Sequence, residues 1–237
     1  MSSSTTTAPA IEARTISAGY VGQAAIRDVS LAVAPGEVVC LLGPNGAGKT
    51  STLLSLAGEL PLMSGKVLIR GEVTTEKLHR RARKGLSYIT EERSVFKALT
   101  TRDNLRCGGV DPESAIELFP ELRSRMDVRA GLLSGGEQQM LTLARALNRG
   151  ADILLADELS LGLAPLIVER LLQAVRDAAD RGTAALIVEQ HARKALKYAD
   201  RVVVMRRGRV EMTLSAAEAM SRLSEIEDAY LTMQEPA

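Results

Sequence analysis

Three segments of the chain, at 38–42, 153–156 and 184–188, are continuous runs of apolar residues. Such runs are typical of parallel strands that are covered on both faces of a sheet. We expect the first of these strands to begin one residue earlier, at Glu37. Other clusters of aliphatic residues predict three more strands, at 66–70, 86–89 and 201–205.

Helical patterns lie between these segments. The clearest begins at Pro165, which suits a first helical position, and ends near residue 180, shortly before Gly182. Its charged and amide side chains lie on the face opposite the apolar one. Because strands alternate with helices, the pattern predicts an α/β fold with a mainly parallel sheet. The apolar face comprises Val168, Leu171, Leu172, Val175, Ala178 and Ala179.

Two regions depart from this alternation and predict antiparallel strands. They span 11–36 and 66–73, where extended segments are separated by turn-forming residues. We expect turns at Gly19, at Pro35-Gly36 and at Gly71, because glycine and proline favour turn conformations. The sequence therefore predicts an N-terminal antiparallel β subdomain beside the parallel core.

The segment 97–133 has little strand character and carries short helical patterns broken by glycine and proline. We interpret it as a helical lobe inserted into the α/β core. There is no internal repeat, so we predict one domain over 11–237. Residues 1–10 have neither the basic nor the apolar region of a secretory signal, and we expect a disordered leader there.

The composition sets limits on partners and location. The 237 residues carry 30 basic and 29 acidic side chains, and this near balance gives no reason to expect nucleic acid as a partner. No run approaches the roughly 20 apolar residues that cross a bilayer. Two cysteines indicate no disulfide framework; Cys40 lies in an apolar strand. We therefore predict a cytoplasmic protein that depends on another chain for any work at a membrane.

The motif GPNGAGKT, at 43–50, follows the strand that ends at residue 42. Its glycines allow backbone N–H groups to turn toward phosphates, Lys49 adds a positive charge, and Thr50 offers a hydroxyl to Mg²⁺. A glycine-rich turn without function is the alternative, but a strand before it and a helix after it favour a nucleotide site. We expect nucleotide contacts from Gly43, Pro44, Asn45, Gly46, Ala47, Gly48, Lys49, Thr50 and Ser51.

Two adjacent carboxylates, Asp157 and Glu158, follow the buried strand at 153–156. Open α/β sheets bind ligands at the carboxyl ends of their strands, and two carboxylates there are costly without a cation. We predict that Asp157 binds Mg²⁺ and that Glu158 is the base that orients the attacking water. A solvated acidic turn is the alternative.

The third motif, LSGGEQQ at 133–139, predicts a helix that Ser134 caps. Its apolar stripe comprises Met140, Leu143, Ala144 and Leu147. A capped helix with no further role is the alternative. Two glycines at the start of a helix are locally unfavourable, however, so we interpret Gly135 and Gly136 as places of close approach to a ligand.

The order of these three motifs resembles that of ATP-binding subunits of ABC transporters, from about residue 11 to about 230. The resemblance implies a P-loop NTPase core, ATP hydrolysis, and a dimer in which the 133–139 motif contacts ATP bound to the facing subunit. It also implies that 160–163 crosses to the partner's site. The residues expected to contact that second ATP are Leu133, Ser134, Gly135, Gly136, Glu137 and Gln138.

Further positions follow from the same resemblance. Tyr20 stands where the family places a ring against adenine, although a core or turn tyrosine is an alternative. Glu91 occupies the place of a glutamine that helps to hold Mg²⁺, and Gln190 that of a catalytic histidine. His191 is a second candidate for that switch role; a solvated histidine at a helix start is commoner.

The pattern resembles one branch most closely, the importers of branched-chain amino acids and related amides or urea, and within it the second ATPase subunit. The residues that carry this resemblance lie at 117–120, 160–165 and 188–191. Three positions depart from it: Leu159 replaces a usual proline, and Thr90 and Glu92 replace a proline and a glycine. We expect Leu159 to affect the hydrolysis rate. We expect Thr90 and Glu92 to affect how the 90–96 loop contacts a permease.

The implied partners are a second ABC ATPase subunit (a different chain, or a second copy), two multi-span permeases that dock near 91–105, and indirectly an extracytoplasmic solute-binding protein. The implied location is the inner face of the cell membrane. Two alternatives stay open. One is a soluble ABC ATPase of translation or DNA repair, which the lack of a second ATPase unit disfavours. The other is a nucleotide-gated regulatory subunit with weak hydrolysis.

Overall fold

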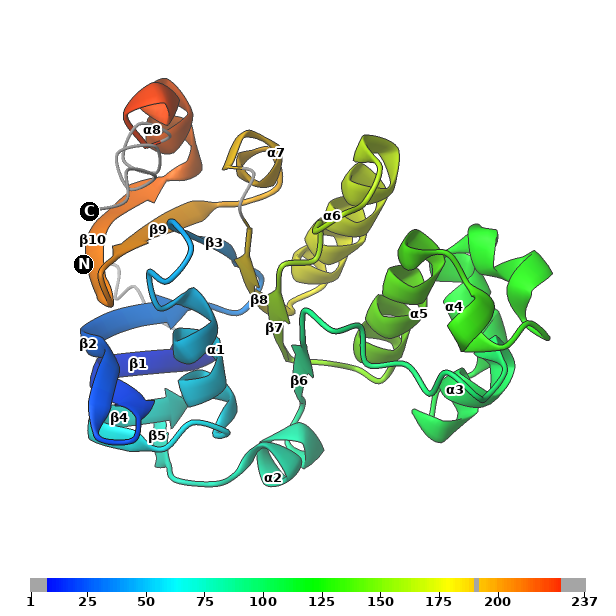
Figure 1. Cartoon of the computed structure of the whole chain (residues 1–237), viewed down its shortest axis with the longest axis horizontal. Coiled ribbons are helices and arrows are strands. Elements are labelled where there is room, and N and C mark those ends of the chain that lie inside the picture. The colour runs from blue at the N-terminus through cyan, green and yellow to red at the C-terminus, as the bar shows by residue number, and fades with distance from the viewer. Residues whose placement is uncertain (1–7, 190–191, 227–237) are drawn as a thin grey trace, which may run out of the picture.

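A computed structural model of the chain describes residues 8–189 and 192–226, which form two sheets surrounded by helices (Figure 1). The smaller sheet is antiparallel and has the strand order β2-β1-β4-β5. The larger sheet has the order β10-β9-β3-β8-β7-β6. The strands are β1 (Ile11–Tyr20), β2 (Gln23–Val33), β3 (Val38–Leu42), β4 (Leu62–Ile69), β5 (Glu72–Thr74), β6 (Leu86–Ile89), β7 (Ile153–Asp157), β8 (Ala184–Val188), β9 (Arg201–Arg206) and β10 (Arg209–Ser215).

Five neighbouring strands of the larger sheet, β9, β3, β8, β7 and β6, are parallel, and β10 pairs antiparallel with β9. The predicted α/β fold with a mainly parallel sheet and an antiparallel β subdomain is thus confirmed. Strand β10 was not predicted, because its side chains alternate between exposed and half-buried and form no apolar run. The strand predicted at 66–70 begins earlier, at Leu62, and the one predicted to include Glu37 begins at Val38.

The helices cover both faces of the larger sheet. Helix α1 packs between the antiparallel sheet and one face of the larger sheet, where Val39 and Leu41 point. Val38, Cys40 and Leu42 belong to the cluster on the opposite face, with α5 and α6. The helices are α1 (Lys49–Ala57), α2 (Leu78–Arg83), α3 (Thr101–Cys107), α4 (Pro112–Leu118), α5 (Gly135–Asn148), α6 (Pro165–Asp180), α7 (Ala192–Leu196) and α8 (Ala216–Ser221).

Helix α6 has the predicted bounds, and the six residues of its predicted apolar face are all buried. The segment predicted as a helical lobe contains α3, α4 and two 3-10 turns, η1 (Pro120–Arg125) and η2 (Ala130–Leu132). Its buried side chains, such as Phe119 and Leu122, share one hydrophobic cluster with α5 and α6. The segment therefore packs onto the core through α5 (Figure 1).

The turn predicted at Gly19 was wrong. Gly19 lies inside β1, and the chain reverses at Val21 and Gly22 instead. A Cβ atom at residue 19 would lie 1.8 Å from the carbonyl oxygen of Gln23, so glycine is required there by the close approach of β2. The turns at Pro35-Gly36 and at Gly71 are where they were predicted.

The N-terminal boundary also differs from expectation. Ala10 is buried, and its N–H donates a hydrogen bond to the carbonyl of Val33 at 2.8 Å, so order begins before Ile11. Residues 1–7 of the predicted leader lie outside the described residues. None of the helices described is long and apolar enough to cross a membrane.

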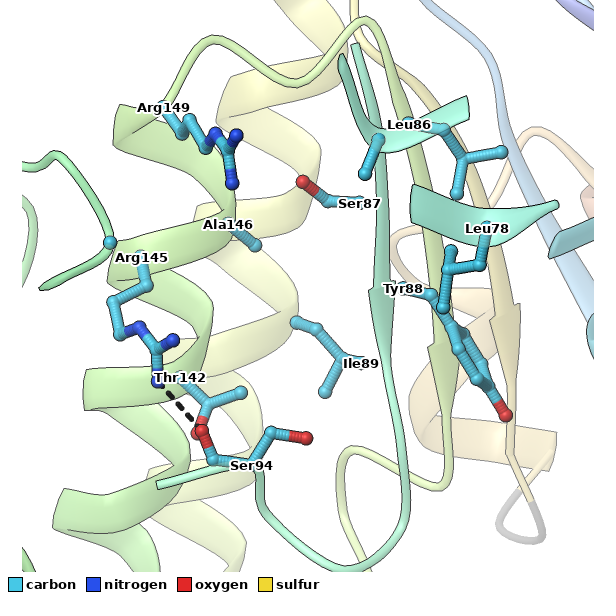
Figure 2. Close-up of a pocket in the computed structure, with 12 residues that line it drawn as sticks. Leu78, Leu86, Ser87, Tyr88, Ile89, Ser94, Thr142, Arg145, Ala146 and Arg149 are labelled. Carbon is cyan, nitrogen blue, oxygen red and sulfur yellow. Dashed lines mark hydrogen bonds between the residues drawn. The ribbon is translucent and has the colours of Figure 1, made fainter. Parts of the chain in front are cut away.

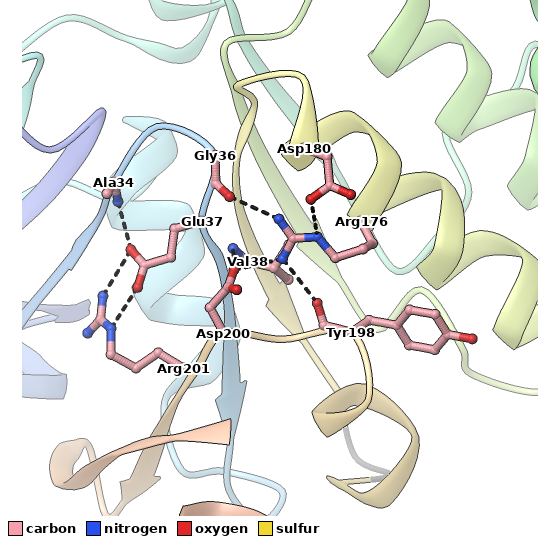
Figure 3. A network of polar contacts seen from close by, with 9 residues as sticks. All are labelled: Ala34, Gly36, Glu37, Val38, Arg176, Asp180, Tyr198, Asp200 and Arg201. Atoms are coloured by element: carbon pink, nitrogen blue, oxygen red, sulfur yellow. Dashed lines mark hydrogen bonds and ion pairs between the residues drawn. The ribbon is translucent and has the colours of Figure 1, made fainter. Parts of the chain in front are cut away.

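A polar network fastens the amino-terminal end of β3, opposite the end that carries the nucleotide motif (Figure 3). The Asp200 carboxylate accepts hydrogen bonds from the Val38 N–H at 2.8 Å and from Arg176 Nη1 at 2.7 Å. Arg176 Nη2 also donates to the Gly36 carbonyl, which ties α6 to the turn before β3. Arg201 and Glu37 form a further ion pair at 2.8 Å. These contacts hold β3 in place beneath the motif that follows it.

Candidate functional site

The loop between β3 and α1 carries the motif GPNGAGKT, and its backbone needs glycine at two places. Gly48 has φ of 100°, and a Cβ there would lie 2.7 Å from the Ile26 side chain on β2. Gly43 has φ of 154°, and a Cβ there would lie 2.4 Å from the Met205 carbonyl on β9. The loop is therefore wrapped tightly around the start of α1, as a phosphate-binding turn requires.

A cavity of about 520 Å³ opens in front of this loop. It brings the predicted residues Glu91 and Glu158 together with the loop, although they come from the ends of different strands. Tyr20 and the 133–138 segment do not line it. The lining residues are Ala25, Asn45, Gly46, Ala47, Gly48, Lys49, Thr50, Ser51, Glu91, Glu158 and Leu161.

Lys49, the first residue of α1, is buried with its ammonium group turned back onto the loop. Nζ donates to the carbonyls of Gly43 at 2.7 Å and Pro44 at 3.1 Å. Burial lowers the pKa of Lys49, and the nearby carboxylates of Glu158 and Asp157 partly oppose that shift. The ammonium group is thus held at the mouth of the loop, where an anionic ligand would stabilise it.

Asp157 ends β7 and is 2% exposed. Burial raises the pKa of its carboxyl, a Thr50 side-chain hydrogen bond lowers it, and Glu158 and Glu91 raise it. Its Oδ1 atom has no hydrogen-bond partner among the described residues. A buried carboxylate oxygen without a partner, beside a threonine hydroxyl, suits Mg²⁺, which is usually held by one or two carboxylates and by phosphate oxygens. Within the described residues, no three His, Cys, Asp or Glu side chains form a group that could hold a metal ion.

Glu158 is partly exposed and faces the cavity. Its φ of 50° places it in the left-handed region, which is unusual for a residue with a Cβ. The Glu158 N–H donates to the carbonyl of Val188 at the end of β8, at 3.1 Å. The turn after β7 is thus bound to the neighbouring strand and directs this carboxylate toward the loop.

The predicted helix after residue 134 is confirmed as α5. The Ser134 hydroxyl accepts from the Glu137 N–H, and the Glu137 side chain accepts from the Ser134 N–H, which forms a capping box. Arg125 and this capping hydrogen bonding lower the pKa of Glu137, although burial opposes the shift. The start of α5 is therefore rigid and lies outside the cavity of its own chain.

The two glycines of α5 have close protein neighbours in this chain. A Cβ at Gly135 would lie 2.8 Å from Arg93 Nη1, and a Cβ at Gly136 would lie 2.9 Å from Ile167. The guanidinium group of Arg93 is the far end of a flexible side chain and can move, so packing restricts Gly135 less than Gly136, which meets the side chain of Ile167. The predicted close approach of a ligand to both glycines stays a prediction.

Tyr20 ends β1 with its side chain 52% exposed, so its ring is available for stacking. Gln190, predicted as a catalytic residue, and His191, the alternative, lie outside the described residues. The roles predicted for these three residues therefore stay predictions.

A hydrogen-bonded pair that was not predicted from the sequence, Ser160 and Glu189, lies at the turn that carries Glu158. Glu189 follows β8, is 2% exposed and receives a hydrogen bond from the hydroxyl of Ser160. Burial raises the pKa of its carboxyl to about 7, although hydrogen bonds from Ser160 oppose that shift. The sequence signal was a carboxylate directly after an apolar strand, the same signal that identified Asp157.

We expect this carboxyl to make stability depend on pH. In the unfolded chain Glu189 ionises near its ordinary value of 4.5, and in the folded chain near 7, so stability falls as pH rises between these values. Replacing Glu189 with glutamine removes this loss. The unfolding free energy of the variant minus that of the parent should therefore rise by roughly 2 to 3 kcal/mol from pH 5 to pH 8.

Denaturant unfolding at both pH values measures this difference. The exposed Glu169 on α6 offers the matched control, since Glu169→Gln should show no such change. A difference between Glu189→Gln and parent that stays constant with pH would show that Glu189 ionises normally.

Comparisons with known proteins agree with this geometry. The family model described as "ABC transporter" matches residues 26–160, which contain all three motifs. The chain is 40% identical to the "High-affinity branched-chain amino acid transport ATP-binding protein BraG" of Pseudomonas aeruginosa, over 87% of this chain and 93% of that protein. The chain belongs to the ABC transporter family. It is an ATPase, and it binds nucleotide.

Other ABC proteins share most of the chain. The "Probable branched-chain amino acid transport ATP-binding protein LivF" of Archaeoglobus fulgidus is 36% identical, over 86% of this chain and 92% of its own. The "Lipopolysaccharide export system ATP-binding protein LptB" of Acidithiobacillus ferridurans is 34% identical, over 84% and 88%. A crystal structure of a nucleotide-free ATP-binding cassette from an ABC transporter superposes with a TM-score of 0.84 at 23% identity, over 96% of this chain and all of that one. That structure confirms the ABC cassette fold.

The exposed ring of Tyr20 predicts a measurable contribution to nucleotide affinity in this ABC ATPase. Stacking of a base on an aromatic ring is worth roughly 1–3 kcal/mol, so Tyr20→Ala should weaken ATP binding by about 5- to 140-fold. Tyr20→Phe keeps the ring and should bind ATP like the parent. Equilibrium binding of a fluorescent ATP analogue compares the three proteins, and equal affinity in Tyr20→Ala would place adenine elsewhere.

Proposed function

We propose that this ABC ATPase is the energy-coupling subunit of a membrane importer for branched-chain amino acids or related small polar solutes. One observation carries the coupling role. The loop that binds phosphate faces a cavity with Glu91 and Glu158, whereas Ser134 to Gln138 lie outside that cavity. One chain thus holds two different halves of a site, and two chains face to face would complete both.

The residues around the cavity have distinct roles in this proposal. Lys49 neutralises charge on the β- and γ-phosphates, and the N–H groups of the loop bind their oxygens. Thr50 and Asp157 would hold Mg²⁺ with the help of Glu91, and the ion when bound would neutralise further phosphate charge. Glu158 orients the attacking water and accepts its proton. Gln190, which lies outside the described residues, would contact the γ-phosphate.

The opposite half of the site comes from α5. Its first residues present N–H groups at the positive end of a helix of 14 residues, which attracts anions. Leu133 and Glu137 support this arrangement from either side of Ser134. We infer that this segment binds the γ-phosphate of ATP in a second ABC ATPase subunit, either a different chain or a second copy.

A groove beside the edge strand β6 offers a place for a permease. It has a volume of about 200 Å³ and lies between β6, α2 and α5 (Figure 2). Arg145 of α5 donates to the Ser94 carbonyl at 2.7 Å and lies over the Phe96 ring. Arg149 lines the same groove. The two arginines favour an acidic side chain in the permease segment that binds here.

The remaining parts of the proposal follow from this role. The ATPase would work at the cytoplasmic face of the cell membrane, bound to two multi-span permeases. An extracytoplasmic solute-binding protein would deliver the solute, and nucleic acid has no part in the reaction. The relatives BraG and LivF support an amino-acid solute. LptB supports a second candidate, the export of a lipid-linked solute, because it also matches most of the chain.

Affinity purification tests the proposal directly. Tagged Glu158→Gln protein is recovered from gently solubilised native membranes with ATP, and its partners are identified by mass spectrometry. We expect a second ATPase subunit and two multi-span permeases of an amino-acid importer. Recovery of lipid-export components instead would favour the second candidate. Recovery of only ribosomal or repair proteins would contradict both and leave the ATPase site intact.

A further inference from the structure

The turn that carries Glu158 is attached to the end of β8 at two points. The first is the hydrogen bond from the Glu158 N–H to the Val188 carbonyl, at 3.1 Å. The second is the hydrogen bond that the Ser160 hydroxyl donates to the Glu189 carboxylate. Leu159, between the two attached residues, is buried in the core. Two residues of the turn are thus held at the end of β8, and the residue between them is held by the core.

This attachment matters because the turn is strained. A glutamate with φ of 50° keeps that conformation only when its surroundings hold it there. A proline after this residue would restrict the backbone through its ring. Leu159 supplies no such restriction, so the contacts with the end of β8 have to hold the turn.

Among the residues that the structure describes, no cation forms an ion pair with Glu189. Its Oε1 atom has no hydrogen-bond partner within residues 8–189 and 192–226. The titratable groups that face it are Glu158 at the end of β7, Cys40 of β3 and Lys194 of α7. A carboxylate with one orphan oxygen is costly to bury. Its hydrogen bond to the turn that carries Glu158 supplies a reason for its burial.

We propose that Glu189 is a positioning residue for ATP hydrolysis, which holds Ser160 and thereby keeps Glu158 directed at the attacking water. The ionised carboxylate is the stronger acceptor, because the hydrogen bonds from Ser160 favour that form. The same contact joins the end of β8 to the loop that carries Leu161. This inference rests on the proposed function only in taking Glu158 as the base.

The test is ATP hydrolysis by the complex that the tagged full chain brings from membranes. Glu189→Ala should lower kcat by about 100-fold, the effect of a misplacement near 1 Å, with ATP affinity within twofold of the parent. Glu189→Gln still accepts from Ser160 and should recover most of the rate. Ser160→Ala removes one small hydroxyl, so it keeps the proposal testable where Glu189→Ala fails to fold; we expect a drop of about 10-fold.

Two readouts separate positioning from a general structural role. The kcat of the parent should rise as pH increases through 7, as Glu189 ionises and binds Ser160 more strongly, whereas Glu189→Gln should show no such rise between pH 6 and 8. The double variant Ser160→Ala/Glu189→Ala should be no slower than Glu189→Ala, because both changes remove one contact.

The outcomes also distinguish this inference from the proposed function. Full activity and the parental pH profile in Ser160→Ala and Glu189→Gln, together with an inactive Glu158→Gln, would overturn the inference alone. Unimpaired hydrolysis in Glu158→Gln would overturn the role of the base and, with it, the reason to position it.

Discussion

Glu158→Gln should lower the ATP turnover of the assembled complex by about 100- to 10,000-fold, the range that a general base contributes. Glutamine is similar in shape and keeps a hydrogen-bonding oxygen, but it does not accept the proton of the attacking water. Neither hydrogen bond that attaches the strained turn to the end of β8 uses the Glu158 side chain, so both should persist. ATP binding should be unchanged or stronger, because the substitution removes a negative charge from a cavity that receives phosphates.

Two measurements on the same protein check this result. Phosphate release gives the turnover, and equilibrium binding of a fluorescent ATP analogue gives the affinity. Glu169→Gln, on the exposed face of α6, provides a control with the same chemical change and should behave like the parent. Turnover above about a tenth of the parental rate in Glu158→Gln would show that another group acts as the base.

Ser134→Arg should abolish hydrolysis in the assembled complex while each chain still binds ATP. The arginine would extend from the start of α5 into the space where the phosphate of the facing subunit is expected. It would also remove the capping box, which typically costs only about 1 kcal/mol. Because Ser134 does not line the cavity of its own chain, the ATP site of that chain should be unaffected.

A second capping box in the same chain supplies the matched control. The Ser215 hydroxyl caps α8 in the same way, with Glu218 as its partner. Ser215→Arg therefore loses an equivalent cap at a helix that has no expected contact with ATP, and it should hydrolyse ATP at the parental rate. Ser134→Ala separates the loss of the cap from the added bulk. Parental turnover in Ser134→Arg would be incompatible with a site that α5 completes across a dimer.

Much of the fold was predictable because its signals are local. A continuous apolar run predicts a strand covered on both faces, and β3, β7 and β8 all lie where such runs predicted them. The periodicity of α6 predicted its bounds and its buried face. Strand β10 was not predicted, because an edge strand with alternating exposed and half-buried residues has no continuous apolar run. The turn predicted at Gly19 was wrong because the glycine is required by the close approach of β2, and this approach arises only when the strands pair.

The nucleotide motif was predictable because its chemistry is concentrated in eight consecutive residues and depends on backbone conformation. The sequence by itself determined that a strand, a glycine-rich loop with Lys49 and a helix follow one another, and that two carboxylates end a buried strand. It also determined the capped helix at 134, because a capping box is formed by residues three positions apart. Each of these features depends only on neighbours along the chain.

Only the tertiary structure decided which of these features meet. Parallel pairing of β6, β7 and β8 brings the carboxyl ends of these strands together, and Glu91, Glu158 and Glu189 follow those ends. About a hundred residues of sequence separate the first of these glutamates from the last. Folding also places Arg93 against Gly135 and Ser160 against Glu189. Burial then raises the pKa of Asp157 and of Glu189, because a carboxylate loses its hydration only when other parts of the chain surround it.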